Sequence, residues 1–537
     1  MREFGVAKTR VLRGFGFGGV FDPTASARSV ILGHEAQAAY FSFFCKLFAM
    51  IVISRALLTL ALVITGLPFC RGQIIDDRSN FHATADYYDQ ITSRRNMSVD
   101  PNVAALNQFF SIMPKGGDIH HHYSGAIYSE TYLDWVAKEG NWINRETFQI
   151  ETSKSPHSLT VAELRNDGKL YRELLRRWSD QDYETVYHNE MAPDQQFFQT
   201  FNYFVDLASR HIPEGLRQLK QRAKHENLQY LETMLSAVDF EYCEPALDRR
   251  LLDLQATHQQ SAILSEYEAC RKKLDADPGF QEAVGKFVQD VGRYHEGMDD
   301  DEFLIRYQTY AYRDSPPSTV FASLYAGFSA AEQSDLIVGV NILGPENGVI
   351  ALRDYQLHML MFHLLHQRFP KVRIAMHAGE LTLGMVRPEN LTFHITEAVR
   401  VAGAERIGHG VDIVHETDSL KLLTEMASKK IAVEINLTSN EFILGVEGAA
   451  HPITVYQQFG VPLVISTDDP GVSRNNLSNQ YMLMATRYRL PYPKVKEIVT
   501  NSIRYSFLST DDRERALERL RAQFHRFETQ IARLANE

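Results

Sequence analysis

Short apolar runs alternate with longer amphipathic runs over most of this chain, and this alternation restricts the fold more than any other feature. The predicted strands are residues 117–123, 228–234, 304–311, 336–343, 372–376, 406–410, 431–436 and 462–466. Helical patterns follow them, for example at 317–332, 355–369, 389–402 and 418–428. Short strands that alternate with helices favour a parallel sheet. Because there are eight of them, we predict an α/β fold, a (β/α)8 TIM-type barrel with its site at the carboxyl ends of the strands.

The barrel is predicted to occupy residues 111–510, and the other segments are predicted to decorate it. Two polar, charged stretches near 141–195 and 238–300 interrupt the alternation after the early strands, and we interpret both as helical insertions. Residues 73–110 have a helical tendency and are expected to wrap the outside. In residues 511–537 the pattern predicts an amphipathic helix with the apolar stripe Leu517, Leu520, Phe524, Phe527, Ile531 and Leu534. Such a stripe is typical of a helix that docks on its own domain, although a homodimer contact stays open.

Residues 1–72 are predicted to be a leader that ends in a signal peptide. Within residues 50–72, a short segment with Arg55 precedes an apolar run from Ala56 to Leu67. These lengths match the charged, apolar and exit regions of a signal peptide. An uncleaved anchor over residues 47–69 is the alternative, but its uninterrupted apolar run is short for a membrane span. We therefore expect a secreted or periplasmic protein with no stable membrane insertion after cleavage.

Charge and cysteine content restrict the partners and the chemistry. A net charge of -11 and a pI near 6.0 leave no broad basic surface, so nucleic acid is not an expected partner and a neutral small molecule fits better. Of the four cysteines, Cys243 and Cys270 remain once the leader is removed. A disulfide between them would contribute about 3 kcal/mol, but two free thiols would give the same sequence, so both states stay open. Neither cysteine has the spacing of a zinc ligand.

Histidine and acidic residues gather where predicted strands end. His120 and His122 share the first strand, and on an extended segment their imidazoles point to one face, which makes half of a zinc site. His377 ends the fifth strand, His409 lies in the sixth, and Asp468 follows the eighth. Since the carboxyl ends of barrel strands share one mouth, these side chains are expected to converge.

Four motifs carry a resemblance to a known family. Ile119–Ala126, His377–Glu380, Arg406–Gly410 and Ser466–Pro470, in this order on a βα repeat, resemble the adenosine deaminase family of the metal-dependent amidohydrolase superfamily, over roughly residues 105–510. The export signal and the insertions are similar to those of its secreted members. The resemblance implies that one Zn²⁺ ion is held by His120, His122, His377 and Asp468. Three neutral imidazoles and a carboxylate suit zinc and leave a position for water.

The same resemblance implies roles around the substrate. Glu380 is the acid that protonates purine N1 as hydroxide attacks C6, and His409 orients and stabilises that hydroxide. Asp469 hydrogen-bonds N7. The backbone amide of Gly344 contacts N3, although a glycine after a strand is also a common turn residue. The implied reaction is hydrolytic deamination of adenosine, and of deoxyadenosine, in which adenosine gives inosine and ammonia.

One position departs from the family pattern. Where many members carry an aspartate that contacts the 5′ hydroxyl, this chain has Ser124, which cannot make the same charge-assisted contact. Another aminopurine or a 5′-modified nucleoside therefore stays open as the substrate. A secreted protein that binds nucleosides without turnover is a further alternative, but a pure binder has no use for Glu380 and His409.

Other polar residues near the strand ends are interpreted as structural. His121 alternates with the predicted ligands and should pack on the opposite face. Asp412 and Glu434 are interpreted as capping or solvated residues, and His394 as part of a helix. Asn440 follows the seventh strand and is expected to support the site indirectly.

Overall fold

The computed structural model describes residues 69–181, 183 and 191–535. The chain divides into two compact units, Met1–Ile75 and Asp76–Glu537, and the fold below is that of the second. The predicted signal peptide lies outside the described residues except at its end, where helix α2 (Phe69–Ile91) begins. Within the described part of the chain, no helix combines the length and apolar character needed to cross a membrane.

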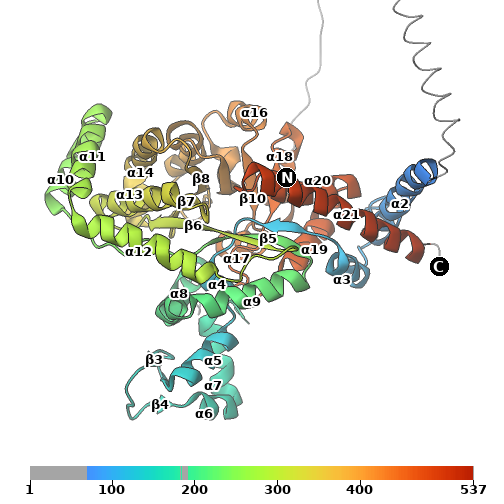
Figure 1. Ribbon diagram of the computed structural model, residues 1–537, viewed down its shortest axis with the longest axis horizontal. Helices are drawn as coiled ribbons and strands as arrows, with labels where there is room; N and C mark the ends of the chain where they lie inside the picture. Colours follow the sequence, from blue (N-terminus) through green and yellow to red (C-terminus); the bar gives the residue numbers. More distant parts are fainter. Residues whose placement is uncertain (1–68, 182, 184–190, 536–537) are drawn as a thin grey trace, which may run out of the picture. The chain divides into compact units, whose positions relative to one another are not determined.

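Eight parallel strands form a single sheet that closes into a barrel (Figure 1). They are β1 (Gly116–Asp118), β5 (Leu228–Met234), β6 (Leu304–Tyr312), β7 (Ile337–Leu343), β8 (Arg373–Ala378), β9 (Arg406–His409), β10 (Ala432–Ile435) and β11 (Leu463–Ile465). Their order in space is their order in the chain, as βαβ units require. The ends of the first and last strands are joined by backbone hydrogen bonds of 3.0 Å, from Asp468 to the His120 carbonyl and from His122 to the Asp468 carbonyl. The predicted (β/α)8 barrel is confirmed.

Helices cover the outside of this barrel, so most strand residues are buried on both faces of the sheet. The main ones are α9 (Ile212–His225), α13 (Pro317–Gln333), α14 (Val349–Arg368), α16 (Ser419–Lys429), α18 (Ile453–Phe459) and α20 (Tyr492–Arg504). Local sequence sets their ends. Helix α13 starts at a proline, which is favoured at the first helical position because its missing amide needs no partner there. Helix α18 ends at Gly460, whose φ of +71° suits the left-handed C-cap.

Two helical segments differ from the sequence prediction. The helix expected at 389–402 is divided into a 3-10 turn (Pro388–Leu391), α15 (His394–Glu397) and a π-helical turn (Ala398–Ala402). The buried carboxylate of Glu416 accepts the Ile395 amide at 2.6 Å, so the second piece starts afresh on its own cap. Helix α17 (Leu437–Leu444) was not predicted, because it is largely buried and has no amphipathic pattern.

The first insertion contains a small sheet as well as helices. The antiparallel strands β2 (Trp142–Asn144), β3 (Ile150–Glu151) and β4 (Ser158–Leu159) follow α5 (Ser129–Glu139), and α6 (Val161–Asn166), α7 (Gly168–Trp178) and α8 (Pro193–Arg210) come next. Strands of two or three residues are too short to show a period of two, so sequence could not reveal them. The indole of Trp178 donates to the Phe148 carbonyl at 3.2 Å and ties the end of α7 to the loop between β2 and β3.

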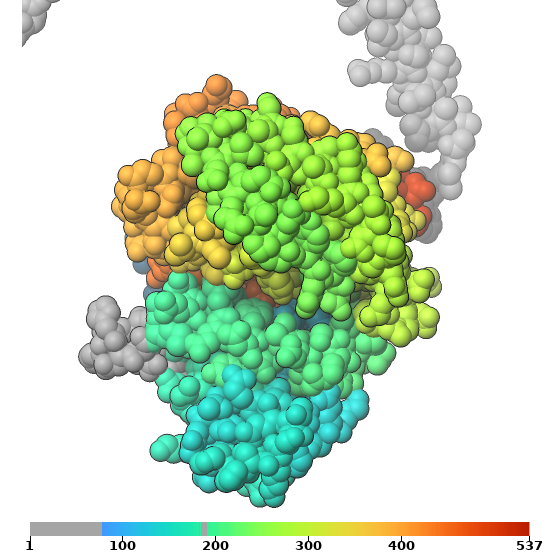
Figure 2. Space-filling model, turned by 90° about the vertical axis from the view of Figure 1, so that its left-hand side faces the viewer, coloured from blue at the N-terminus to red at the C-terminus, as the bar shows by residue number. Residues whose placement is uncertain are grey.

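The second insertion is helical, as predicted, with α10 (Pro245–Ala256), α11 (Gln260–Asp275) and α12 (Pro278–His295). In Figure 2 a hollow separates these green helices from the blue-green helices of the first insertion. Cys243 is exposed, Cys270 is buried, and both thiols are free, so the structure contains no bridge between them.

The terminal helices dock on the barrel. Helix α3 (Val103–Ile112) packs on α19 (Leu477–Tyr488), and the Phe109 ring lies 5.0 Å from that of Phe527 in α21 (Thr510–Leu534). Most of the predicted stripe on α21 is buried in this contact, whereas Leu534 is 45% exposed. The stripe is therefore a docking face within the chain.

Candidate metal-binding active site

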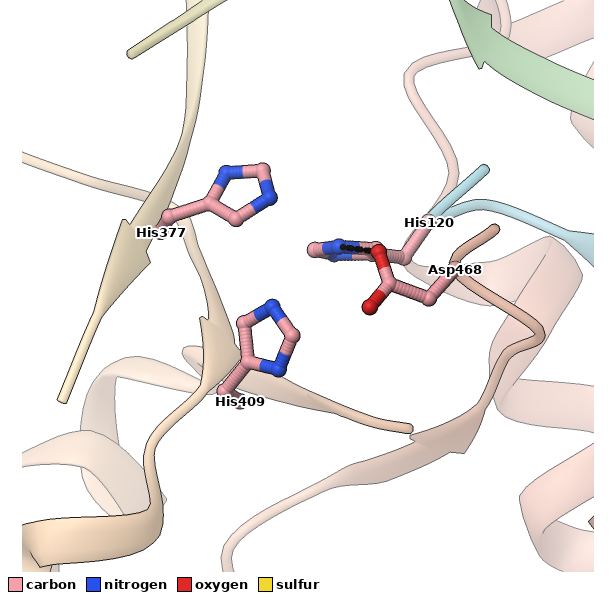
Figure 3. A group of neighbouring side chains, drawn as sticks. All are labelled: His120, His377, His409 and Asp468. Carbon is pink, nitrogen blue, oxygen red and sulfur yellow. Dashed lines mark hydrogen bonds and ion pairs between the residues drawn. The ribbon is translucent and has the colours of Figure 1, made fainter. Parts of the chain in front are cut away.

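Side chains from four strand ends point toward one centre at the mouth of the barrel, as Figure 3 shows for four of them. These four side chains are His120, His377, His409 and Asp468. Each offers one ligand atom, and the four atoms lie within 4.8 Å of one another. His122 forms an overlapping group with Asp468 and Asp469. The structure thus brings together all the residues that the sequence predicts as metal ligands.

Asp468 lies at the centre of the cluster. Its Oδ1 is 3.1 Å from Nε2 of His120 and 3.1 Å from Nε2 of His122. Nε2 of His122 is 3.2 Å from Nε2 of His377. Nitrogen and oxygen atoms from three strand ends therefore surround one point at close contact.

The second nitrogen of two of these histidines faces an acceptor. Nδ1 of His120 lies 2.7 Å from the carboxylate of Glu434, and Nδ1 of His377 lies 2.9 Å from Oδ1 of Asn341. That amide oxygen also accepts the backbone N–H of Ile342 at 2.8 Å, which fixes the amide orientation. A neutral imidazole that donates from Nδ1 has only a lone pair at Nε2. When their rings are neutral, His120 and His377 therefore turn lone pairs toward Asp468 and His122, and a cation among these atoms would take the place of the proton that His120 otherwise holds.

The electrostatics of the cluster also favour positive charge. Burial lowers the pKa of His120, but hydrogen bonds to Asp468 and Glu434 outweigh it and raise that pKa to about 10. Burial acts to raise the pKa of Asp468, yet its bonds to His120 and His122 hold that pKa well below its usual range. A site that keeps a proton between two carboxylates offers the negative potential that a metal ion needs.

Strained backbone and close-packed glycines place these side chains. Asp468 and His409 have φ values of +63° and +65°, which are uncommon outside glycine and concentrate at functional sites. A Cβ on Gly408 would lie 2.7 Å from Cε1 of His120, and a Cβ on Gly125 would lie 1.5 Å from Oδ1 of Asp469. The two motif glycines are required because site side chains occupy the space a larger residue would need.

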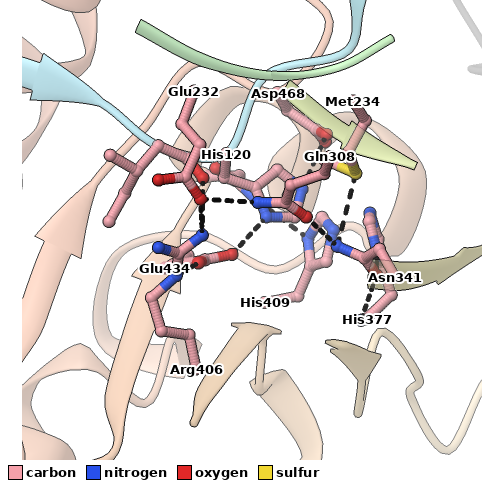
Figure 4. Close-up of polar contacts among 12 residues, drawn as sticks. His120, Glu232, Met234, Gln308, Asn341, His377, Arg406, His409, Glu434 and Asp468 are labelled. Atoms are coloured by element: carbon pink, nitrogen blue, oxygen red, sulfur yellow. Dashed lines mark hydrogen bonds and ion pairs between the residues drawn. The ribbon is translucent and has the colours of Figure 1, made fainter. Parts of the chain in front are cut away.

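Behind the cluster, buried polar side chains form a continuous chain of contacts from His120 to His377 (Figure 4). In order, they are Glu434, Arg406, Glu232, Gln308 and Asn341. Arg406 donates to Glu434 at 2.5 Å, pairs with Glu232 and lies 3.8 Å from the centre of the Phe507 ring. This network orients both histidines, as the outer partners of metal ligands do.

Sequence reasoning missed most of this network. Glu434 was interpreted as a capping or solvated residue, and that is wrong because it is 1% exposed and contacts His120. Glu232, Gln308 and Asn341 were not assigned a role. One sequence feature could have indicated these residues: each is a polar residue inside a short strand. In a closed barrel such a side chain faces either the interior or the helix layer.

Glu380 follows β8 on a turn that Glu346 holds in place. The Glu346 carboxylate accepts the amides of Gly379 and Glu380 at 3.2 and 2.9 Å, and it lies 2.5 Å from Nδ1 of His394. Burial, together with the charges of Asp468 and Glu346, raises the pKa of Glu380 well above its usual range. A carboxyl that keeps its proton near neutral pH is suited to donate it.

The cluster forms the floor of a cavity of about 680 Å³. The predicted substrate residues Ser124, Gly344 and Asp469 line the same cavity. Oδ1 of Asp469 is buried and has no hydrogen-bond partner among the described residues, so it is available to a ligand. Sequence reasoning did not assign the rest of the cavity wall to the site. Helix α8 contributes apolar and amide side chains in alternation, and strand ends add further apolar and aromatic ones: Gln195, Phe197, Phe198, Gln199, Phe201, Asn202 and Val205, with Met234, Tyr310, Tyr312, Leu343 and Pro345.

Comparison with known proteins points to one family. Residues 321–523 match the family model described as adenosine deaminase. An adenosine deaminase of Yersinia pseudotuberculosis serotype IB (strain PB1/+) is 33% identical over 153 residues, which cover 28% of this chain and 42% of the relative. One from Escherichia coli (strain SMS-3-5 / SECEC) is 30% identical over 190 residues, which cover 35% and 52%. The chain therefore spans about half the length of the curated relatives it matches.

A solved structure supports the fold. The crystal structure of the Arabidopsis N6-mAMP deaminase MAPDA superposes with a TM-score of 0.50 at 17% identity, over 77% of this chain and 99% of that one. At this identity the likeness concerns the barrel and not the reaction. The first His-X-His pair lies before the matched family region, whereas the other three motifs lie within it.

Proposed function

We propose a function that starts from the family: the chain belongs to the adenosine deaminase family, whose model its residues 321–523 match. Our proposal is that it is a zinc-dependent hydrolase that converts adenosine, and deoxyadenosine, to the 6-oxo nucleoside and ammonia. The observation that carries it is the set of three Nε2 atoms gathered around Asp468 beside Glu380, on the floor of one cavity.

The cluster fits a zinc ion. Three imidazole nitrogens and one carboxylate oxygen, with contacts of 3.1 to 3.2 Å among them, are the ligand types that zinc prefers. His120, His122, His377 and Asp468 would hold the ion. Bound zinc supplies a Lewis acid that lowers the pKa of water to near 7.

The remaining side chains act on the purine. Glu380 donates a proton to N1, which makes C6 electrophilic, and the oxygen of water is added there before the C6–N bond breaks and ammonia leaves. Asp469, whose Oδ1 has no partner among the described residues, donates a hydrogen bond to N7, because burial raises the pKa of this carboxyl well above its usual range and so keeps it protonated. Both carboxyl groups are buried, which strengthens their interactions with the purine.

The cavity wall favours a nucleoside over a nucleotide. C6 and N9 are at opposite ends of a purine, so with C6 at the floor the sugar lies in the outer half. No lysine or arginine occurs among the described residues that line the cavity, and Asp314 adds a negative charge. A phosphate would lose water there without gaining a cation, which is unfavourable. The aromatic residues of the cavity wall are also compatible with a nucleoside that carries an apolar 5′ substituent, which is the alternative substrate that Ser124 leaves open.

A substrate panel tests this proposal. The purified full-length protein is given adenosine, deoxyadenosine, 5′-methylthioadenosine and AMP, and the loss of the adenine absorption band and the release of ammonia are followed. We expect turnover of the nucleosides and weak turnover of AMP. Preference for AMP would contradict the nucleoside assignment, and ligand binding without turnover of any compound would support the binding-protein alternative.

A further inference from the structure

We infer that His451 and Asn440 fix the tautomer of His409, so that its Nε2 presents an N–H and not a lone pair to the metal cluster. This inference deepens the proposed function and rests on it only for its catalytic meaning. It makes His451 and Asn440 positioning residues, and it decides whether His409 is a metal ligand or a hydrogen-bond donor.

One hydrogen bond at the start of helix α18 has a certain direction. The backbone amide of Ile453, in the first turn of α18, lies 3.2 Å from Nδ1 of His451. A backbone N–H can only donate, so Nδ1 accepts. His451 is 1% exposed, and burial, reinforced by Arg487, lowers its pKa to about 4, so the ring is neutral. Its single proton is therefore on Nε2.

The next contact fixes an amide. Nε2 of His451 is 3.1 Å from Oδ1 of Asn440. Because Nε2 carries the proton, the atom facing it must be the oxygen, which settles an orientation that is otherwise ambiguous. Nδ2 of Asn440 then points the other way, to Nδ1 of His409 at 2.9 Å. Asn440 is fully buried, so no solvent competes for either bond.

This chain of hydrogen bonds ends at His409, which lies in the metal cluster. An amide nitrogen can only donate, so Nδ1 of His409 accepts, and Nδ2 of Asn436 approaches the same atom at 3.5 Å. A ring that accepts at Nδ1 holds its proton on Nε2, so the contact with Asn440 sets the tautomer of His409. Oε1 of Glu380 lies farther from the same Nδ1, at 3.4 Å, so the shorter contact from Asn440 sets the role of this nitrogen.

The hydrogen-bond partner of Nδ1 therefore decides whether Nε2, the nitrogen that faces the cluster, carries a lone pair or a proton. Acceptors behind His120 and His377 leave lone pairs at Nε2, which bind a metal. A donor behind His409 leaves an N–H at Nε2, and this atom has no partner among the described residues. His409 belongs to the cluster by distance, yet it cannot donate electrons to the ion. It is placed to donate a hydrogen bond to the attacking oxygen.

The hydrogen-bond chain from His451 through Asn440 to His409 is tested by replacing the Asn440 amide donor with an acceptor. Asn440→Asp puts a carboxylate behind His409 and should move the proton to Nδ1, while Asn102→Asp is a matched control at an exposed N-cap where aspartate is equally suitable. Tautomers are read by ¹⁵N NMR of the histidine-labelled, zinc-loaded full-length protein, which needs no turnover. Failure of the inference can thus be separated from failure of the proposed function.

We expect His409 to be protonated at Nε2 in the parent protein and at Nδ1 in Asn440→Asp. The variant should keep its zinc and its KM but lose about 100-fold in kcat, the scale of a misplaced acid–base group. His451→Gln, which can still donate to Asn440, should retain most activity, whereas His451→Phe should not. A parent spectrum with the proton at Nδ1, or an unchanged tautomer in Asn440→Asp, would overturn the inference. If that variant does not fold, equal kcat values for His451→Gln and His451→Phe would overturn it as well.

Discussion

His120 and Asp468, at the two ends of the barrel sheet, are joined twice. The backbone amide of Asp468 donates to the His120 carbonyl at 3.0 Å, and the two side chains meet at 3.1 Å. The seam that closes the barrel is thus also the centre of the proposed metal site. Binding at this cluster should therefore stabilise the folded barrel, because a site assembled only in the folded chain links metal affinity to folding.

Removal of the metal should lower the unfolding temperature. At free zinc about 1,000 times its dissociation constant, the stabilisation is about 4 kcal/mol. Thermal unfolding with and without a chelator measures the difference. Asp468→Ala, which lacks the central ligand, should bind little zinc and show no chelator effect. An unchanged unfolding temperature of the parent protein in chelator would contradict this coupling.

Glu380→Gln should leave zinc bound and reduce kcat by about 100-fold to 10,000-fold, because the amide cannot give its proton to the purine. Zinc content and initial rates are measured on the same preparation. Glu389→Gln, on the nearby 3-10 turn, is the matched control and should behave like the parent. Near-normal activity of Glu380→Gln would exclude the proton-donor role.

Glu434→Gln should weaken zinc binding by about 10-fold to 100-fold, the usual effect of losing an outer partner of a metal ligand. The substitution removes the charged acceptor for His120 and leaves Arg406 partly unpaired. Zinc affinity is measured by competition with a chelating dye. Glu441→Gln, whose carboxylate is 42% exposed, should not change it. Equal affinities for both variants would show that the network does not orient the ligand.

Gly125→Ala should displace Asp469, whose Oδ1 lies where the new methyl group would be. A displacement of about 1 Å in a substrate contact can cost about 100-fold in rate. We expect a lower kcat/KM for adenosine with zinc retained. Gly285→Ala, with no atom within 4 Å of the added carbon, is the control and should keep the parent value.

His358 gives a prediction about pH and stability. Burial in α14 lowers its pKa from 6.5 to about 3, so the folded state favours the neutral ring. The contribution of the neutral His358 ring to the free energy of unfolding is complete above pH 6.5. It is lost as the pH falls toward 3, because the unfolded chain then binds a proton that the folded chain does not bind. Between pH 7 and pH 5 the free energy of unfolding therefore falls by about 2 kcal/mol. His358→Gln should lose less stability over that range in urea unfolding, whereas exposed His82→Gln should lose as much as the parent.

The sequence predicted those parts of the molecule that depend on local pattern. Strand β5 (Leu228–Met234) was predicted with its observed limits because its four apolar residues and Thr233 form a short run between charged segments. The predicted site residues converge because the carboxyl ends of parallel strands must meet, whatever the details of packing. The sequence did not reveal which polar residues stand behind the histidines. A polar residue such as Glu232 or Asn341 gives the same sequence pattern whether it faces solvent or the barrel interior, and only the closed sheet shows which face it occupies.

Reconstitution with zinc tests the central claim most directly. The full-length protein is stripped with a chelator, zinc is added in steps, and the adenine absorption of adenosine is followed at each step. The account predicts no turnover without metal and a rate that rises in proportion to bound zinc, up to about one ion per chain. Full zinc loading with an unchanged adenosine spectrum would contradict it.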